Sequence, residues 1–376
     1  MSAPGGDIAT VRAIDRARSI ARRVEAAGFR VRATRFRPYT RLLPVGDWAS
    51  WVIDEEMASV RRVARGLGIR VEERRRLNLL DAQSVFFGSQ FDLLGRATDL
   101  RSHRVATAYF HGKPGTGYPD FDTIYERLRQ THERLSRIQV SHREMREIVL
   151  ESGIAPDKVH LIPIGIELAL FALRTQASCA EARRTLGLPL SVPVIGSFQK
   201  DGVGWGEGLE PKAIKGPDVF VDVAARLVQS FPDLHVLLSG PARGYVKTRL
   251  SERGIPYVHV HPKSYRGMGQ LYQALDAYLI SSRQEGGPKA VLESLAVGVP
   301  LVSTRVGQAN DLIEHGVNGY LVDIDDVDGL AHYATLALDT PNSFEASGRA
   351  TAEAHSYARQ APLWERFFDG FVEWNF

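Results

Sequence analysis

Two glutamates, Glu285 and Glu293, lie eight residues apart around the first turns of a helix that is predicted to begin at Pro288. At ~1.5 Å rise per residue their carboxylates would be about 12 Å apart. Gly286 and Gly287 precede the helix, and their amide groups lie at its positive end, where an anion can approach because neither residue has a side chain. The pattern indicates an extended polar ligand with a charged middle and one carboxylate at each end.

A histidine follows a predicted strand in the first half of the chain. Residues 84–88 and 105–110 are short β-branched and aromatic runs, which are typical of buried parallel strands. The second run ends at His111. Ligand sites in open α/β sheets form beyond the carboxyl ends of strands, so His111 is a candidate site residue; a structural histidine that caps a loop is the alternative. The following HGKPGTG is no P-loop, because its glycines and lysine are in the wrong order.

The two glutamates belong to a longer ordered pattern. EGGPKAVLES is followed by GVPLVSTRVGQANDLI and then by GVNGYLV. This run resembles the donor-binding signature of retaining GT-B glycosyltransferases of family 4 (glycosyl transferases group 1), and the resemblance covers roughly residues 105–340. It implies that Glu285 reaches hydroxyls of the donor sugar, that Glu293 holds the ribose and that His111 lies near the donor sugar. The other interpretation of each glutamate is a solvated acid on a helix.

The same resemblance implies a diphosphate site made by cations. Lys215 matches the family lysine, whereas Ser197 stands where the family has an arginine. Lys200 is expected to substitute for that arginine, although an ammonium cannot make the bidentate contact of a guanidinium, and Lys212 is the competing candidate. The glycine-rich insert KDGVGWGEGLEPKAI, which contains Trp205, is expected to be either a lid over the ligand or a loose surface loop.

Two further features concern the acceptor side and the crossing between domains. Gly46 and Asp47 precede a helix predicted to run to about residue 67, and the resemblance implies that this loop faces the acceptor. A plain N-cap at Asp47 is the alternative. Ile164 stands where the family usually has asparagine, which removes a polar group from that position. The linker between the domains is expected around residues 165–190.

Length and composition place limits on the class of protein. A chain of 376 residues suits two domains of moderate size, and no apolar run approaches the ~20 residues that span a bilayer. The start, MSAPGGDIAT, has no apolar signal region, so we expect a cytoplasmic protein. The single Cys179 excludes an intramolecular disulfide framework and a multi-cysteine metal site. The acidic run at 323–326 predicts a turn and a helix cap rather than a metal site.

Charge is divided unevenly along the chain. Residues 1–180 hold 29 Lys and Arg against 21 Asp and Glu, so the first half is basic although the whole chain has a net charge of only +3. Seven arginines cluster between residues 61 and 76, namely Arg61, Arg62, Arg65, Arg70, Arg74, Arg75 and Arg76. They predict either a solvated helical surface or a face for anionic lipid or a phosphate-bearing acceptor. No recognised motif supports nucleic-acid binding.

Together these features predict an α/β protein of the GT-B type, with two Rossmann-like domains facing a central cleft. Residues 1–170 would form the acceptor-side domain and 171–376 the donor-binding domain, with the last aromatic helix crossing back to the first. The resemblance implies transfer of a hexose-type sugar from UDP- or GDP-hexose, with retention, to a carbohydrate, lipid-linked or small-molecule acceptor in glycan or cell-envelope synthesis. It also implies a front-face reaction in which the leaving phosphate helps to deprotonate the acceptor.

No metal and no other cofactor are expected, and contact with a membrane would be peripheral, through the basic first domain. The alternatives are a sugar phosphorylase or nucleotide-sugar epimerase of the same architecture, a non-catalytic nucleotide-sugar-binding protein, and a basic adaptor for membranes or nucleic acid. The substitutions at Ser197 and Ile164 keep the non-catalytic alternative open.

Overall fold

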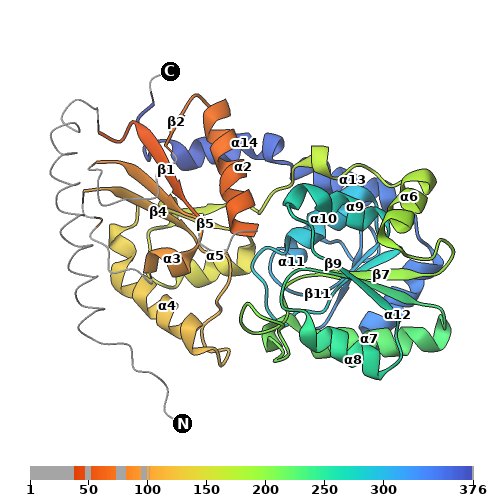
Figure 1. The fold of residues 1–376 in the computed structure, drawn as a ribbon. Coiled ribbons are helices and arrows are strands. Elements are labelled where there is room, and N and C mark those ends of the chain that lie inside the picture. Colours follow the sequence, from red (N-terminus) through yellow and green to blue (C-terminus); the bar gives the residue numbers. More distant parts are fainter. Residues whose placement is uncertain (1–37, 47–51, 73–81, 95–99, 101, 375–376) are drawn as a thin grey trace, which may run out of the picture.

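The computed structural model describes residues 38–46, 52–72, 82–94, 100 and 102–374. In these ranges the chain forms two parallel sheets of six strands, one from each half of the chain (Figure 1). Residues 8–27, whose alternating apolar and basic positions at helical spacing predict a helix, lie outside the described residues. The regular alternation of strands and helices confirms the predicted α/β class with two Rossmann-like units.

The first sheet has the strand order β2-β1-β3-β4-β5-β6 and all its pairs are parallel. Its strands are β1 (Arg41–Val45), β2 (Arg70–Val71), β3 (Ser84–Phe87), β4 (Arg104–Ala108), β5 (Arg137–Val140) and β6 (Val159–Leu161). The helices of this half are α2 (Val52–Gly66), α3 (Gln90–Leu94), α4 (Pro119–Thr131) and α5 (Arg143–Leu150). Helices α3, α4 and α5 cover one face of the sheet and α2 the other. The central strands β3, β4 and β5 are buried on both faces, which explains their mainly apolar sequences.

The second sheet has the order β12-β11-β10-β7-β8-β9 and is also parallel. Its strands are β7 (Val194–Phe198), β8 (His235–Ser239), β9 (Tyr257–Val260), β10 (Ala277–Ile280), β11 (Leu301–Thr304) and β12 (Tyr320–Val322). The helices are α6 (Gln176–Leu186), α7 (Pro217–Ser230), α8 (Gly244–Glu252), α9 (Met268–Gln273), α10 (Lys289–Val297), α11 (Ala309–Leu312), α12 (Val327–Asp339), α13 (Glu345–Ala354) and α14 (Tyr357–Phe368).

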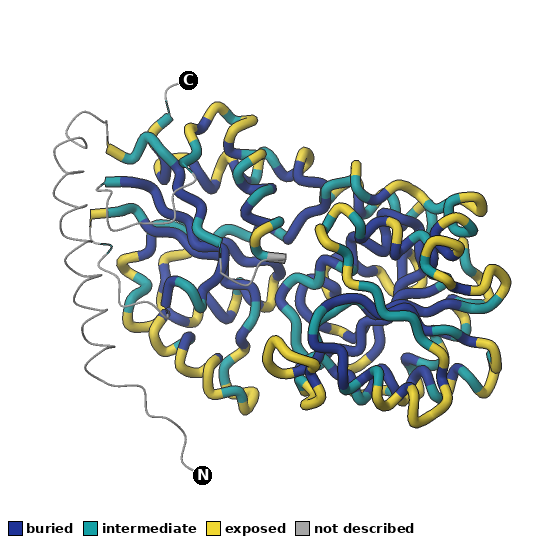
Figure 2. The backbone as a smooth tube through the Cα atoms, viewed as in Figure 1, coloured by how far each residue is buried: buried dark blue, intermediate teal, exposed yellow. Residues whose placement is uncertain are grey.

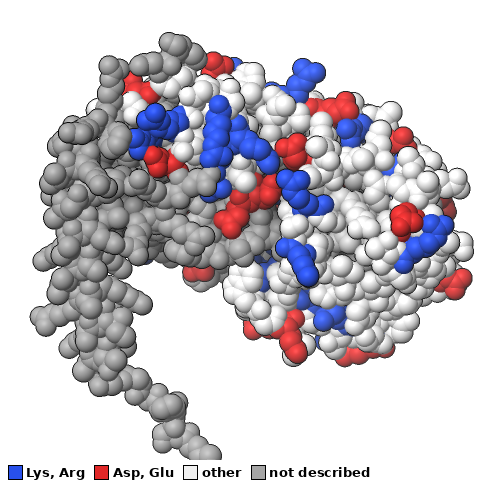
Figure 3. All heavy atoms as spheres, turned by 45° about the horizontal axis from the view of Figure 1, so that its top comes forward, with Lys and Arg blue, Asp and Glu red and all other residues white. Residues whose placement is uncertain are grey.

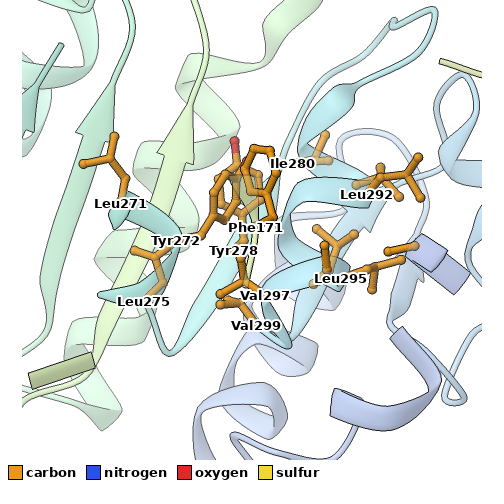
Figure 4. Close-up of a cluster of buried hydrophobic side chains, with 14 of the residues drawn as sticks. Phe171, Leu271, Tyr272, Leu275, Tyr278, Ile280, Leu292, Leu295, Val297 and Val299 are labelled. Carbon is orange, nitrogen blue, oxygen red and sulfur yellow. The ribbon is translucent and has the colours of Figure 1, made fainter. Parts of the chain in front are cut away.

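Each face of the second sheet has its own apolar cluster. Helices α7, α8 and α12 pack on one face, and α9, α10 and α13 pack on the other. Figure 4 shows the second cluster, in which the rings of Phe171, Tyr272 and Tyr278 lie together, with Leu271 and Leu275 on one side and Leu292 and Leu295 of α10 on the other. The backbone of the strands is buried while the connecting loops are largely exposed (Figure 2). This core fixes α10, and therefore Glu293 within the helix and Glu285 shortly before it.

The last helix, α14, packs on the first sheet although it comes from the end of the chain. Trp364, Phe367 and Phe368 are fully buried in one cluster with Phe86 of β3 and Met57 of α2. The Trp364 and Phe367 rings meet Phe86 edge to face, at 5.8 and 5.3 Å between ring centroids. The aromatic positions of this helix therefore join the two halves of the chain.

Helix α10 begins one residue later than the sequence predicts. Pro288 has an extended ψ of 107° and is the N-cap, so Lys289 is the first helical residue. Its end agrees with the prediction, because Gly298 has a φ of +80°, which glycine adopts without strain. The predicted cap in the acidic run is also confirmed: the Asp326 side chain accepts a hydrogen bond from the Gly329 amide at 2.8 Å.

Basic and acidic side chains interleave on the face that carries α2 and α14 (Figure 3). Arg62 lies 3.6 Å from Glu55 and 3.3 Å from Glu167, so part of the predicted arginine cluster is paired. Arg74, Arg75 and Arg76 lie outside the described residues. In the described ranges, no helix has both the length and the apolar character that crossing a membrane requires.

Candidate functional site

Two loops that follow parallel strands meet where the domains touch. One follows β4 in the first domain, and the other connects β10 to α10 in the second. A side chain on Gly286 would collide with the Phe110 carbonyl, so glycine is what allows this approach. Gln308 adds a polar contact between domains, because its side-chain oxygen accepts a hydrogen bond from the Ile164 amide at 3.0 Å. The carboxyl ends of strands from both sheets therefore converge here.

Ile164 makes this polar contact through its backbone. Its side chain instead packs against Gly287, where an added Cβ would lie 2.5 Å from the Ile164 Cδ1 atom. An apolar residue is thus accommodated at the domain crossing without loss of the hydrogen bond to Gln308.

Lys215 and Glu285 form an ion pair, with 2.5 Å between Nζ and Oε1. The Ser282 hydroxyl donates a second hydrogen bond to the same carboxylate oxygen at 2.9 Å. Gly216, directly after Lys215, has a φ of +56°, and a side chain there would collide with the Ser281 carbonyl. The two predicted residues are therefore brought together, as a lysine that can bind phosphate and a carboxylate that can accept hydrogen bonds from hydroxyls.

The amides of Gly286 and Gly287 donate no hydrogen bond to any residue in the described part of the chain. They precede α10, so they lie near its positive end. This arrangement suits an anionic group, as the sequence predicts.

His111 lies on the first-domain side of this site. Its ring contacts the rings of Phe91 and Phe121, at 5.4 and 5.8 Å between centroids, and its carbonyl accepts a hydrogen bond from Gln90 at 2.5 Å. Burial lowers the pKa of His111 to about 4, and the positive charge of Lys215 acts in the same direction. The imidazole is therefore neutral at pH 7 and can donate one hydrogen bond to an uncharged group.

Two further lysines lie near this pair. Burial lowers the pKa of Lys212, and the charges of Lys215 and Lys200 lower it further. The charge of Lys212 also acts on His111, whereas the Lys200 ammonium lies over the Trp205 ring, 4.2 Å from its centroid. Of the two candidates for the missing arginine, Lys212 is the one whose charge acts on His111, and Lys200 is the one that contacts Trp205.

Glu293 is buried in the middle of α10, and its carboxylate oxygens already have partners. The Tyr265 hydroxyl donates to one oxygen, and the Tyr272 hydroxyl donates to the other at 2.8 Å. Burial raises the pKa of Glu293, and the two tyrosine hydrogen bonds oppose that increase. Each carboxylate oxygen has a second lone pair, so a ribose hydroxyl remains a chemically reasonable additional donor.

Arg243 is a residue near the site that sequence reasoning missed. It is fully buried, and its guanidinium donates to the carbonyls of Ser197 and Ser239 at 2.6 and 2.8 Å. Its Nε atom lies 2.9 Å from Oδ1 of Asp201, the first residue of the insert after Lys200. An arginine from the loop after β8 therefore lies against Ser197, where the family arginine was expected. The only sequence signal that Arg243 belongs near the site was its position in the loop that follows a strand.

Of the two predicted acceptor-side residues, Gly46 lies in the described ranges. Gly46 precedes α2, and a Cβ atom on it would lie 2.7 Å from the Asp54 carboxylate. Close packing against Asp54 therefore explains why this position is a glycine. Asp47 lies outside the described residues. No group of three or more His, Cys, Asp or Glu side chains in the described ranges is arranged to hold a metal ion.

Comparison with known proteins agrees with the geometry of the second domain. Residues 204–339 match the family model described as Glycosyl transferases group 1. A D-inositol 3-phosphate glycosyltransferase from Acidothermus cellulolyticus is 30% identical over 193 residues, which is 48% of this chain and 40% of the relative. Another of that name, from Thermomonospora curvata, is 29% identical over 246 residues, or 61% of this chain and 54% of the relative. The resemblance inferred from the sequence is thereby confirmed, and the matched segments span about half the length of these curated relatives or less.

Solved structures match over more of the chain. The Anabaena protein HepE in complex with UDP and glucose superposes with a TM-score of 0.69 at 15% identity, covering 88% of this chain and 99% of HepE. A sucrose-phosphate synthase from Thermosynechococcus elongatus gives a TM-score of 0.67 at 16% identity and covers 88% and 98% of the two chains. At these identities the likeness concerns the fold, and it confirms the predicted GT-B architecture.

Proposed function

We propose that the protein is a glycosyltransferase that moves a hexose-type sugar from a nucleotide-diphosphate donor to an acceptor with retention at the anomeric carbon. The observation that carries this proposal is the ion pair of Lys215 and Glu285 at the domain boundary, opposite the neutral His111. A lysine can bind the diphosphate, and a carboxylate can accept hydrogen bonds from the sugar hydroxyls. An uncharged imidazole can donate a hydrogen bond to the sugar.

The leaving diphosphate would be the main source of new charge in the reaction. Lys215, together with Lys212, would stabilise it, and the free amides of Gly286 and Gly287 would add uncharged donors. On donor binding Lys215 would exchange its carboxylate partner for a phosphate, which would release Glu285 to accept sugar hydroxyls. This exchange is favourable only in the presence of an anion, so it would couple diphosphate binding to sugar recognition.

His111 would contact the transferred sugar. Because its imidazole is neutral, it would donate a hydrogen bond to a hydroxyl or to the developing charge without repelling the lysines. Neither glutamate of the described site is left to act as a covalent nucleophile: two tyrosine hydroxyls hold Glu293, and Glu285, once released by Lys215, would be engaged by sugar hydroxyls. We therefore infer a front-face reaction in which a leaving phosphate oxygen takes the acceptor proton.

The names of the similar proteins support the substrate classes. HepE binds UDP and glucose in its crystal structure, which supports a UDP-hexose as the first donor to test, with GDP-hexose as the second. The curated relatives act on D-inositol 3-phosphate by name, which supports an acceptor that is a phosphate-bearing polyol or sugar. We propose a role in glycan or cell-envelope glycoconjugate synthesis in the cytoplasm, with peripheral membrane contact through the α2 face; fractionation of cells tests that location.

A donor screen tests the proposal directly. Unfolding temperature is measured with UDP, GDP and their hexose conjugates, since a ligand at ~100 times its dissociation constant adds about 2.7 kcal/mol to stability. The stabilising donor is then incubated with candidate acceptors, and products are identified by mass spectrometry. Release of sugar 1-phosphate only with added phosphate would indicate a phosphorylase, and an epimer without acceptor would indicate an epimerase. Tight binding with no product from any acceptor would favour a non-catalytic binding protein.

A further inference from the structure

The insert between β7 and α7 is held in place by its backbone. The Lys212 amide bonds to the Asp201 carbonyl at 2.7 Å and the Val203 amide to the Glu210 carbonyl at 2.9 Å, so the two ends of the loop pair with each other. The loop is also attached to α8, because the Gly244 amide bonds to the Glu207 carbonyl at 2.7 Å. These contacts argue against both predicted alternatives, a loose surface loop and a lid that moves over the ligand. They make the insert a fixed feature of the second domain.

The tip of this fixed loop presents an exposed tryptophan. The Trp205 side chain is 65% exposed, between glycines whose added Cβ atoms would meet nothing within 4 Å. Lys200 covers one face of the indole at 4.2 Å from the ring centroid. Single exposed apolar residues are ordinary on protein surfaces, but a large flat ring on a rigid loop beside a site is a well-placed surface for stacking.

Charge around the insert favours an anion. Lys200 has no carboxylate within 4.0 Å among the described residues, and burial lowers its pKa. The charges that act on the neighbouring Lys212 are two lysines and one glutamate, Glu285, which is itself paired with Lys215. Glu207 and Glu210 belong to the same insert, but neither forms an ion pair within 4.0 Å of Lys200 or Lys212. The side of the insert that adjoins the site is therefore positive.

We propose that Trp205 and Lys200 form an acceptor subsite for an anionic saccharide or cyclitol. The ring of the acceptor would stack on the exposed indole, and its phosphate or carboxylate would pair with the Lys200 ammonium. Gln199, the residue before Lys200, donates a hydrogen bond to the Lys215 carbonyl at 3.2 Å, and the charge of Lys200 acts on Lys212, whose charge in turn acts on His111. This subsite therefore adjoins the place where the donor sugar would react. Describing the ligand as an acceptor rests on the proposed function, whereas its binding to Trp205 does not.

NMR titration tests the subsite without any need for activity. The indole N–H signal of Trp205, assigned with Trp205→Phe, is followed in the full chain during addition of glucose 6-phosphate, methyl glucuronide, methyl glucoside and glycerol 3-phosphate. Both anionic sugars should shift this signal, with the neutral sugar and the ring-free phosphate at least about tenfold weaker, because each lacks one of the two interactions. Comparing the phosphate with the carboxylate identifies the preferred anion.

Variants complete the test. Trp205→Ala and Lys200→Ala should each weaken the binding of the anionic sugars about tenfold, while their affinity for UDP stays within about twofold of wild type. Leu209→Ala is the control, because Leu209 is exposed on the same insert; it should change neither sugar binding nor UDP binding. Equal binding of neutral and anionic sugars would overturn the role of Lys200. A parallel loss of UDP affinity in both variants would place these residues in the donor site instead, and absence of any shift would overturn the subsite. If wild-type protein binds no nucleotide, the proposed function fails, and the sugar titration still decides this inference.

Discussion

The Nζ atom of Lys289 lies 3.4 Å from Oε2 of Glu56, and this buried pair joins the first turn of α10 to helix α2 of the other domain. The Tyr357 hydroxyl connects them, accepting from Lys289 at 2.9 Å and donating to Glu56 at 2.6 Å. Burial alone would lower the pKa of Lys289, but Tyr357 and Glu56 raise it above its ordinary value, so the lysine is charged. The helix that carries Glu293 is thus attached to the first domain by a hydrogen-bonded charge pair.

Removing one member of this pair should destabilise the protein strongly. Lys289→Met leaves the Glu56 carboxylate buried without its cation, and such a change typically lowers the free energy of unfolding by about 3–5 kcal/mol. Urea unfolding measures the loss. The double variant Glu56→Gln with Lys289→Met should recover much of it, since no buried charge remains. Lys113→Ala is the control, because its pair with Glu144 is about half exposed and should contribute less than about 1 kcal/mol. Equal effects at Lys289 and Lys113 would contradict the pairing.

The lysines of the proposed diphosphate site should differ in importance. Lys215→Ala should weaken nucleoside diphosphate binding at least about tenfold, because it removes a charge-assisted hydrogen bond of ~1.5–3 kcal/mol. Lys212→Ala should have a smaller effect, since Glu285 forms its ion pair with Lys215 and not with Lys212, and burial together with the charges of Lys215 and Lys200 lowers the pKa of Lys212. Isothermal titration with free diphosphate ranks them, and the reverse order would mean that the insert has moved the phosphate site.

Acid should destabilise the protein partly through His111. In the folded state its pKa is about 4, whereas the unfolded chain binds the proton near the ordinary value of about 6.5. Between these values the unfolded state holds more protons, so the stabilising contribution is complete above pH 6.5 and is lost as the pH falls toward 4. The contribution is at most about 3 kcal/mol. The free energy of unfolding, measured from pH 7.5 to 4.5, should therefore depend less on pH in His111→Asn than in the wild-type protein.

His160 provides a comparison for that experiment. Burial lowers its pKa to about 4 as well, but it packs against Phe367 of α14, away from the lysines. His160→Asn should likewise flatten the pH dependence of stability, and it should leave nucleotide affinity unchanged. An unaltered slope in His111→Asn would show that its imidazole is not kept neutral by the fold.

Chelation should not abolish the proposed reaction. Lys215 and Lys212 can supply the positive charge that a leaving diphosphate requires. Transferase assays after EDTA treatment should retain most of the activity. A complete loss that Mg²⁺ or Mn²⁺ restores would show that the lysines are not sufficient.

The local parts of the fold and site could be predicted from the sequence, and the long-range pairs could not. Glycine and proline punctuation located α10 to within one residue, since these residues act on the backbone beside them. Lys289 and Glu56 are 233 residues apart, and each alone is typical of a solvated helix surface. Arg243 likewise reaches Ser197 across 46 residues, through the packing of two neighbouring strands. Such contacts depend on the tertiary arrangement, which a single sequence does not encode position by position.

Glu285 and Glu293 should divide the donor between them. If Glu285 contacts the sugar, Glu285→Ala should leave free diphosphate affinity nearly intact but strongly reduce turnover and nucleotide-sugar affinity. If Glu293 holds the ribose, its loss should weaken both ligands equally, about tenfold or more. Glu293→Gln is the better variant here, because Glu293→Ala would also leave the hydroxyls of Tyr265 and Tyr272 buried without an acceptor. Four dissociation constants, for diphosphate and nucleotide sugar on each variant, test the division. Equal losses for both ligands at Glu285, or none at Glu293, would show that the carboxylates do not share the donor in this way.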